Sequence, residues 1–132
     1  MTAKQKAKQD RQQELRDHWK SVKESLTQSK IDEAMAIMAT HGINSSIVSY
    51  QICLMAMVDA GLEGIPYLDA KTYNGWKKSG FQVKKGEKSF GSGITWVKVG
   101  GKKDEDGEES GGYSFPKSYT LFHRSQVEEI NS

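Results

Sequence analysis

The segment from Trp76 to Lys88 reads W-K-K-S-G-F-Q-V-K-K-G-E-K and holds five lysines and one glutamate. The wider range 71–103 has nine lysines and one acid, a local charge of +8, whereas the whole chain carries +2. The positive charge is therefore concentrated in one part of the chain. Clustered ammonium groups attract phosphates, and aromatic rings beside them offer stacking faces to bases, so the pattern favours nucleic-acid binding.

We expect these lysines to contact phosphates, and either Tyr73 or Trp76 to offer a stacking face. Packing in the core is the alternative for Trp76, and Trp19 and Trp96 are expected to be structural. Asn44 and Ser45 precede an apolar run, where the start of a helix presents donors to a phosphate. Because contacts to phosphates carry no sequence information, we predict weak sequence preference. The candidate DNA-binding residues are Lys77, Lys78, Lys84, Lys85, Lys88, Tyr73, Trp76, Asn44, Ser45 and Arg124.

Other interpretations of the lysine segment stay open. Lysines also keep small domains soluble, although solubilising surfaces normally mix both signs of charge. An acidic stretch at 104–109 counts against nucleic-acid binding unless it points elsewhere. The basic face would alternatively suit an acidic protein, which would make the chain an inhibitor of a host defence or replication protein. A regulator that binds duplex DNA is a third alternative.

The chain lacks the residue patterns of known enzyme and metal sites. His18, His41 and His123 are scattered without the H-E-x-x-H spacing, and the single Cys53 has no partner for a zinc pair. No P-loop and no G-x-S-x-G motif occurs. We therefore predict a protein without catalytic activity, cofactor or metal ion.

Cellular location is indicated only indirectly. A lone cysteine in an apolar stretch suits a reducing compartment, and we expect the cytoplasm of a bacterial host. No run approaches the roughly 18 apolar residues of a membrane span, and no apolar region of a signal peptide follows the N-terminus. No membrane association is expected.

Helical spacing dominates the first half of the chain. Apolar residues recur every three or four positions in 15–26 and in 31–38, and residues 47–60 are nearly all apolar. The third of these helices should lie at the centre of the core, with Ser45 or Ser46 as its cap. Thr72 suits the N-cap of a fourth, short helix.

Beyond Gly80 the period changes to two, which predicts strands in 81–83, 94–99 and 113–122. Between the last two strands lies a glycine-rich, acidic stretch, predicted to be a long flexible hairpin loop. Ser125-x-x-Glu128 fits the capping box of a C-terminal helix. The predicted class is α+β, with N-terminal helices packed on a small antiparallel sheet.

Domain organisation is predicted to be simple. Residues 1–10 are polar and lysine-rich, which indicates a flexible basic tail. Residues 11–132 have the length of one small domain with its own core. We therefore expect a single nucleic-acid-binding domain after the tail.

Two motifs carry a family resemblance. Thr72-Tyr73-x-x-Trp76, followed by Gly80-x-x-Val83-Lys84-Lys85-Gly86-Glu87-Lys88, resembles the signature of the N-terminal domain of ArdC-type antirestriction proteins. The segments 42–44 and 121–127 are similar to further parts of that pattern. The resemblance implies a module that binds single-stranded DNA, from a plasmid or phage. Since full-length relatives carry a metallopeptidase-like domain with H-E-x-x-H, and the sequence has no such motif, a stand-alone module without protease activity is expected, with antirestriction as one candidate role.

Overall fold

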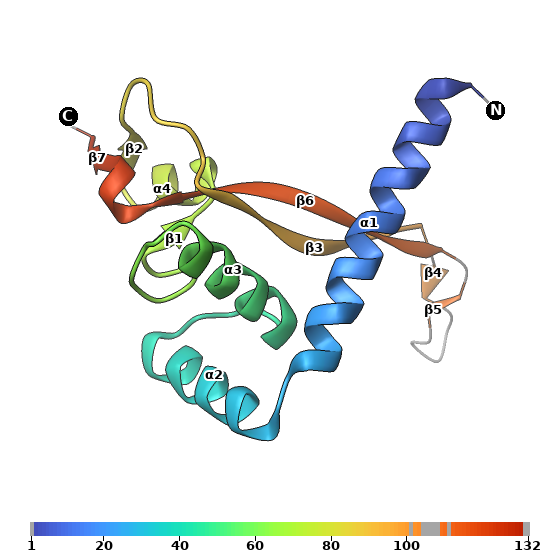
Figure 1. Cartoon of the computed structure of the whole chain (residues 1–132), viewed down its shortest axis with the longest axis horizontal. Coiled ribbons are helices and arrows are strands. Elements are labelled where there is room, and N and C mark those ends of the chain that lie inside the picture. Colours follow the sequence, from blue (N-terminus) through green and yellow to red (C-terminus); the bar gives the residue numbers. More distant parts are fainter. Residues whose placement is uncertain (1, 101, 104–108, 111, 131–132) are drawn as a thin grey trace.

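The computed structural model describes residues 2–100, 102–103, 109–110 and 112–130. Figure 1 shows α1, α2 and α3 gathered beside a long hairpin of β3 and β6, while α4, β1, β2 and β7 lie at one end of that hairpin. The predicted α+β class is confirmed. The elements are α1 (Ala3–Ser25), α2 (Gln28–His41), α3 (Ile47–Asp59), β1 (Ala70–Lys71), α4 (Tyr73–Lys78), β2 (Phe81–Val83), β3 (Gly91–Val99), β4 (Lys102–Lys103), β5 (Glu109–Ser110), β6 (Tyr113–His123), the 3-10 helix η1 (Arg124–Gln126) and β7 (Val127–Glu129).

The sheets are small and antiparallel. β6 is the centre of a three-stranded sheet with the order β1-β6-β3, and β2 pairs with β7 in a separate two-stranded sheet. β3 pairs with β6 along nine positions. β1 reaches only residues 122–123, so Pro116 lies where β6 has a neighbouring strand on one side only. That edge position tolerates the missing N–H of proline.

Helix α3 forms the centre of the core, as its apolar sequence predicts. One face packs Val48 and Ile52 against buried side chains of α1 and β3. Another packs Cys53 and Met57 against β1 and β6. A Cβ at Gly91 would lie 3.1 Å from the Cβ of Ala56, so glycine lets β3 approach this helix closely.

Local sequence signals predicted the starts of α3 and α4 correctly. The Ser46 hydroxyl accepts from the Ser49 N–H at 3.1 Å and caps α3, and Thr72 caps α4 in the same way. Gly42 ends α2 with φ of 65°, a left-handed conformation that glycine adopts without steric cost. Gly80 follows α4 with φ of 89°.

The structure differs from the sequence interpretation at the N-terminus. Residues 3–10, expected as a tail, form the first turns of α1, and their side chains are exposed. Thr2 and Gln5 form a reciprocal capping box, and alanine, lysine and glutamine favour helices, so the helix extends beyond its apolar stripe. Within the predicted stripes, His18 is exposed and Met35 is 54% exposed.

The prediction of a C-terminal helix that starts at Ser125 is wrong. The chain instead makes η1 and then β7, whose Val127 lies opposite Val83 of β2. The capping box forms between His123 and Gln126. The reason lies outside the local sequence, because β2 offers an unpaired edge and Val127 is buried against it.

The connection between β3 and β6 is a hairpin, as predicted. β4 and β5 pair within it, so part of the expected loop is a short ladder. The acidic residues 104–108 lie outside the described residues. No helix in the described part of the chain is long and apolar enough to cross a membrane.

Candidate nucleic-acid interface

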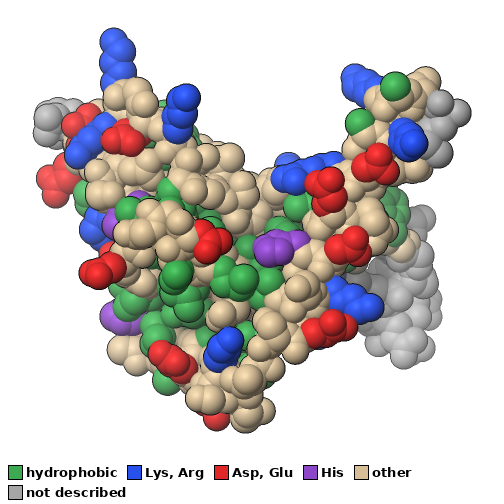
Figure 2. Space-filling model, viewed as in Figure 1, with side chains coloured by type: hydrophobic (Ala, Val, Ile, Leu, Met, Phe, Trp, Pro, Cys, Tyr) green, Lys and Arg blue, Asp and Glu red, His purple; other side chains and the backbone are tan. Residues whose placement is uncertain are grey.

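The five predicted phosphate-binding lysines lie on one structural unit, which we term the lysine lobe: α4, β2, the β2–β3 connection and β7. Lys77 and Lys78 occupy the last turn of α4, and Lys84, Lys85 and Lys88 follow β2. All five side chains are exposed. Figure 2 shows Lys and Arg side chains projecting from the end of the molecule that carries the β2–β3 connection.

The charges of the lobe are less isolated than the sequence indicated. β7 pairs with β2 and brings Glu128 and Glu129 opposite Gln82 and Phe81. Even so, the ion pairs among the described residues join other groups, namely Arg11 to Glu14, Lys20 to Glu24 and Arg124 to Asp69. The five ammonium groups therefore have no carboxylate partner within the described part of the chain, although the ammonium group of Lys84 donates to the Ser125 carbonyl at 3.4 Å.

Trp76 does not offer the predicted stacking face, because its side chain is 0% exposed. Its Nε1–H donates to the Phe122 carbonyl at 2.9 Å, and its ring meets Phe81 edge to face at 5.5 Å. The indole thus joins α4 to β2 and to the end of β6. Tyr73 is the remaining stacking candidate of the predicted set; it is 47% exposed, with the Lys77 ammonium 5.5 Å from its ring centre.

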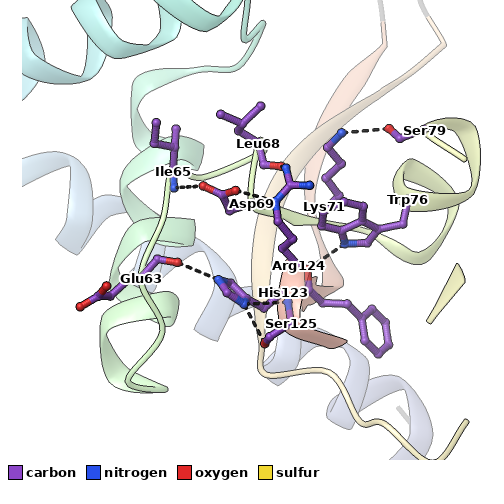
Figure 3. A network of polar contacts seen from close by, with 11 residues as sticks. Glu63, Ile65, Leu68, Asp69, Lys71, Trp76, Ser79, His123, Arg124 and Ser125 are labelled. Carbon is purple, nitrogen blue, oxygen red and sulfur yellow. Dashed lines mark hydrogen bonds and ion pairs between the residues drawn. The ribbon is translucent and has the colours of Figure 1, made fainter. Parts of the chain in front are cut away.

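Arg124 is held by the protein itself, which weakens its assignment as a phosphate ligand. Its Nε–H donates to Asp69 at 2.8 Å, and a second guanidinium nitrogen donates to the Leu68 carbonyl at 2.9 Å (Figure 3). The guanidinium also lies 5.3 Å from the Trp76 ring centre. Burial opposes ionisation of Asp69, but hydrogen bonds from Arg124 and from the Ile65 N–H outweigh it and lower the pKa of this carboxyl.

His123 belongs to the same polar network, which ties the end of β6 to the 61–69 loop. Its Nε2–H donates to the Glu63 carbonyl at 2.7 Å, and its Nδ1 accepts from the Ser125 N–H at 3.1 Å (Figure 3). The ring therefore has a structural role. Within the described ranges, no group of three His, Cys, Asp or Glu side chains is placed to hold a metal ion.

A groove of about 910 Å³, which we term the α3 groove, opens beside the start of α3. Its walls come from α1, the α2–α3 connection, β3, β6 and the residues before α4. None of the described residues that line it is acidic. Asn44 and Ser45 lie in this wall, and none of the five lysines lines the groove. The Ser45 hydroxyl donates to the Ser46 carbonyl at 2.9 Å, which engages the donor that was predicted for a phosphate.

The polar floor of the groove is built around two tyrosines. The Tyr67 hydroxyl donates to the Ser49 carbonyl at 3.0 Å and contacts the Tyr119 hydroxyl. Burial raises the pKa of both phenols, so they stay neutral. A Cβ at Gly93 would lie 2.5 Å from the Tyr119 ring, so glycine makes room for that ring.

Sequence reasoning missed the aromatic wall and the basic residue of this groove. Trp96, assigned to structure, is 37% exposed, and its ring meets Trp19 edge to face at 6.0 Å. Lys71 lines the groove, while its Nζ donates to Ser79 at 2.9 Å, beside the lysine lobe. The one sequence signal for the location of Lys71 was its position directly before Thr72, the N-cap of α4. Nothing local connects Trp19 with Trp96.

The comparison with protein-family models agrees with the motif. The family described as the N-terminal domain of anti-restriction factor ArdC matches residues 4–122. A crystal structure of the antirestriction protein ArdC from plasmid R388, in its metal-free state, is similar with a TM-score of 0.43 and 24% identity, covering 64% of this chain and 29% of that chain. No curated protein matches. Because the family match includes every major helix and both long strands, this chain belongs to the family of the N-terminal domain of the anti-restriction factor ArdC.

Proposed function

We propose that this domain binds single-stranded DNA, largely without sequence preference and without catalysis, as part of a plasmid or phage antirestriction function. The observation that carries the proposal is the set of five exposed lysines, none of which has a carboxylate partner among the described residues. Unpaired ammonium groups attract phosphates and release counterions when they bind. Family membership supports the same function, since this domain family is associated with single-stranded DNA.

In this proposal the lysine lobe follows the sugar-phosphate backbone. Lys77 and Lys78 contact phosphates from the end of α4, and Lys84, Lys85 and Lys88 do so from the β2–β3 connection. Tyr73, half exposed on α4, offers a stacking face beside them. Arg124 supports the lobe through Asp69 and Trp76 instead of contacting DNA.

The test is the double charge reversal K84E/K85E, measured by fluorescence anisotropy with a labelled oligo-dT. We expect binding to weaken more than tenfold, because two attractive contacts become repulsive. The matched control is K4E/K6E, which makes the same charge change on exposed positions of α1. Equal losses in the two variants would indicate diffuse attraction without a formed site. No binding of oligo-dT by the native protein near physiological salt would instead favour an acidic protein partner.

A further inference from the structure

We infer that the α3 groove seats a base of the bound DNA strand against the indole of Trp96. This inference rests on the proposed function and adds a second kind of contact to it. The groove lies next to the lysine lobe, and no residue predicted from the sequence to stack with a base lies in it. Its described lining combines aromatic, hydroxyl and amide groups with one lysine, one histidine and no carboxylate.

Trp96 has the properties of a preformed stacking platform. It lies on β3, and 37% of its side chain remains exposed. Trp19 of α1 meets it edge to face, with an angle of 81° between the rings, so the indole is oriented before any ligand arrives. A large aromatic ring that is held and still exposed binds a base with little loss of side-chain freedom. Stacking of this kind tolerates all four bases.

Polar groups of the groove suit the rest of a nucleotide. Asn44 is exposed, and its amide both donates and accepts, so it can pair with the edge of any base. Thr95 also lines the groove, and its side chain is exposed. The volume of about 910 Å³ lies in the range of small-molecule sites, so one nucleotide fits with room for its neighbour.

The path between groove and lobe is short along the chain. Lys71 and Thr72 line the groove, and α4 begins at the next residue. The Lys71 ammonium reaches Ser79 at the other end of that helix. A strand whose phosphates lie on the lysine lobe therefore meets Lys71 before its next base enters the groove.

The backbone conformation of Tyr67, in the floor of the groove, also supports a binding role for the groove. Tyr67 adopts φ of 64°, an unfavourable conformation for a residue with a side chain, and its phenol closes the floor. Backbone strain of this kind is found preferentially at binding sites. A base inside a duplex is stacked and paired, and it reaches such a groove only after being turned out of the helix. The groove thus favours single strands over duplexes, which the lysines alone do not.

Two oligomers separate stacking from charge: oligo-dT and an abasic deoxyribose-phosphate oligomer of equal length. We expect Trp96→Ala to weaken oligo-dT binding about tenfold, within the range found for one base stacked on an aromatic ring. Binding of the abasic oligomer should stay unchanged, and Trp96→Phe should keep most of the oligo-dT affinity. The matched control is Tyr113→Ala, which removes a 67% exposed aromatic from the same hairpin outside the groove.

The native protein supplies a readout that needs no variant. Tryptophan fluorescence should be quenched by oligo-dT and left unchanged by the abasic oligomer at saturating concentrations. Equal quenching by both oligomers, or none by oligo-dT, would overturn the inference, as would a Trp96→Ala loss that is the same for both. If oligo-dT does not bind at all, the proposed function fails first. If K84E/K85E loses binding while Trp96→Ala keeps it, the proposed function stands and only the groove assignment falls.

Discussion

The lysine lobe and the α3 groove meet at Lys71 but differ in their chemistry. The lobe exposes ammonium groups without carboxylate partners among the described residues, and such charges act over several ångströms and weaken with salt. The groove holds aromatic rings already oriented by their neighbours, with no acidic residue in its described lining. Stacking acts only at contact and responds little to salt. In the proposed function, the lobe attracts the DNA backbone and the adjoining groove selects unpaired bases.

The largest expected effect is on the free energy of unfolding, and it distinguishes Trp76 from Trp96. Trp76→Ala should lower the free energy of unfolding by about 3–5 kcal/mol, because it empties a fully buried site and leaves the Phe122 carbonyl without its donor. Trp96→Ala removes a partly exposed ring and should cost clearly less. Urea unfolding followed by circular dichroism measures both. Equal losses would mean that Trp96 is a core residue, and the contrast between lobe and groove would disappear.

Acid should lower the stability of the fold by breaking the ion pair between Asp69 and Arg124, which supports the lysine lobe. Because the pKa of Asp69 is lowered in the folded state, its stabilising contribution is complete above the pKa of the unfolded chain, about 4, and is lost as pH falls through the folded value. Asp69→Asn should therefore lower the melting temperature near pH 6 and flatten its fall in acid. Thermal melting from about pH 6 to about pH 2 tests this, and parallel curves for both proteins would contradict it.

A smaller effect on oligo-dT affinity is expected for Tyr73, the exposed aromatic residue of the lysine lobe. Tyr73→Ala removes a half-exposed ring that already faces Lys77. Affinity for oligo-dT should fall only a few-fold, since an exposed aromatic contact contributes about 1 kcal/mol. Anisotropy titrations measure this, with Tyr73→Phe as the control. A loss larger than that of Trp96→Ala would move the main stacking site from the groove to α4.

Sequence patterns predicted those features that depend on neighbouring residues. The central helix followed from an apolar run behind Ser46, and the short helix from its cap at Thr72. The five lysines expected to contact phosphates have exposed side chains, although their contact with phosphates stays a prediction. The motif around Trp76 and Lys84 also indicated the family that the comparison then showed.

Features that depend on distant partners were missed or left open. Burial of Trp76 was one of two interpretations of that ring, and it brings the indole N–H to the carbonyl of Phe122, 46 positions away. Val127 joins a strand because β2 offers an edge, although the local pattern fits a helix cap. Trp96 becomes a candidate platform only when α1 brings Trp19 beside it. A single sequence carries no signal for such pairings.

The most direct test of the central claim is the salt dependence of oligo-dT affinity, measured by anisotropy from about 50 to about 300 mM salt. If four or five phosphates meet the lysine lobe, the logarithm of the binding constant should fall against that of salt with a slope of about −3, from about 0.7 per phosphate. Trp96→Ala should keep this slope at lower affinity, whereas K84E/K85E should reduce it. A flat response in the native protein would contradict binding led by the lysines.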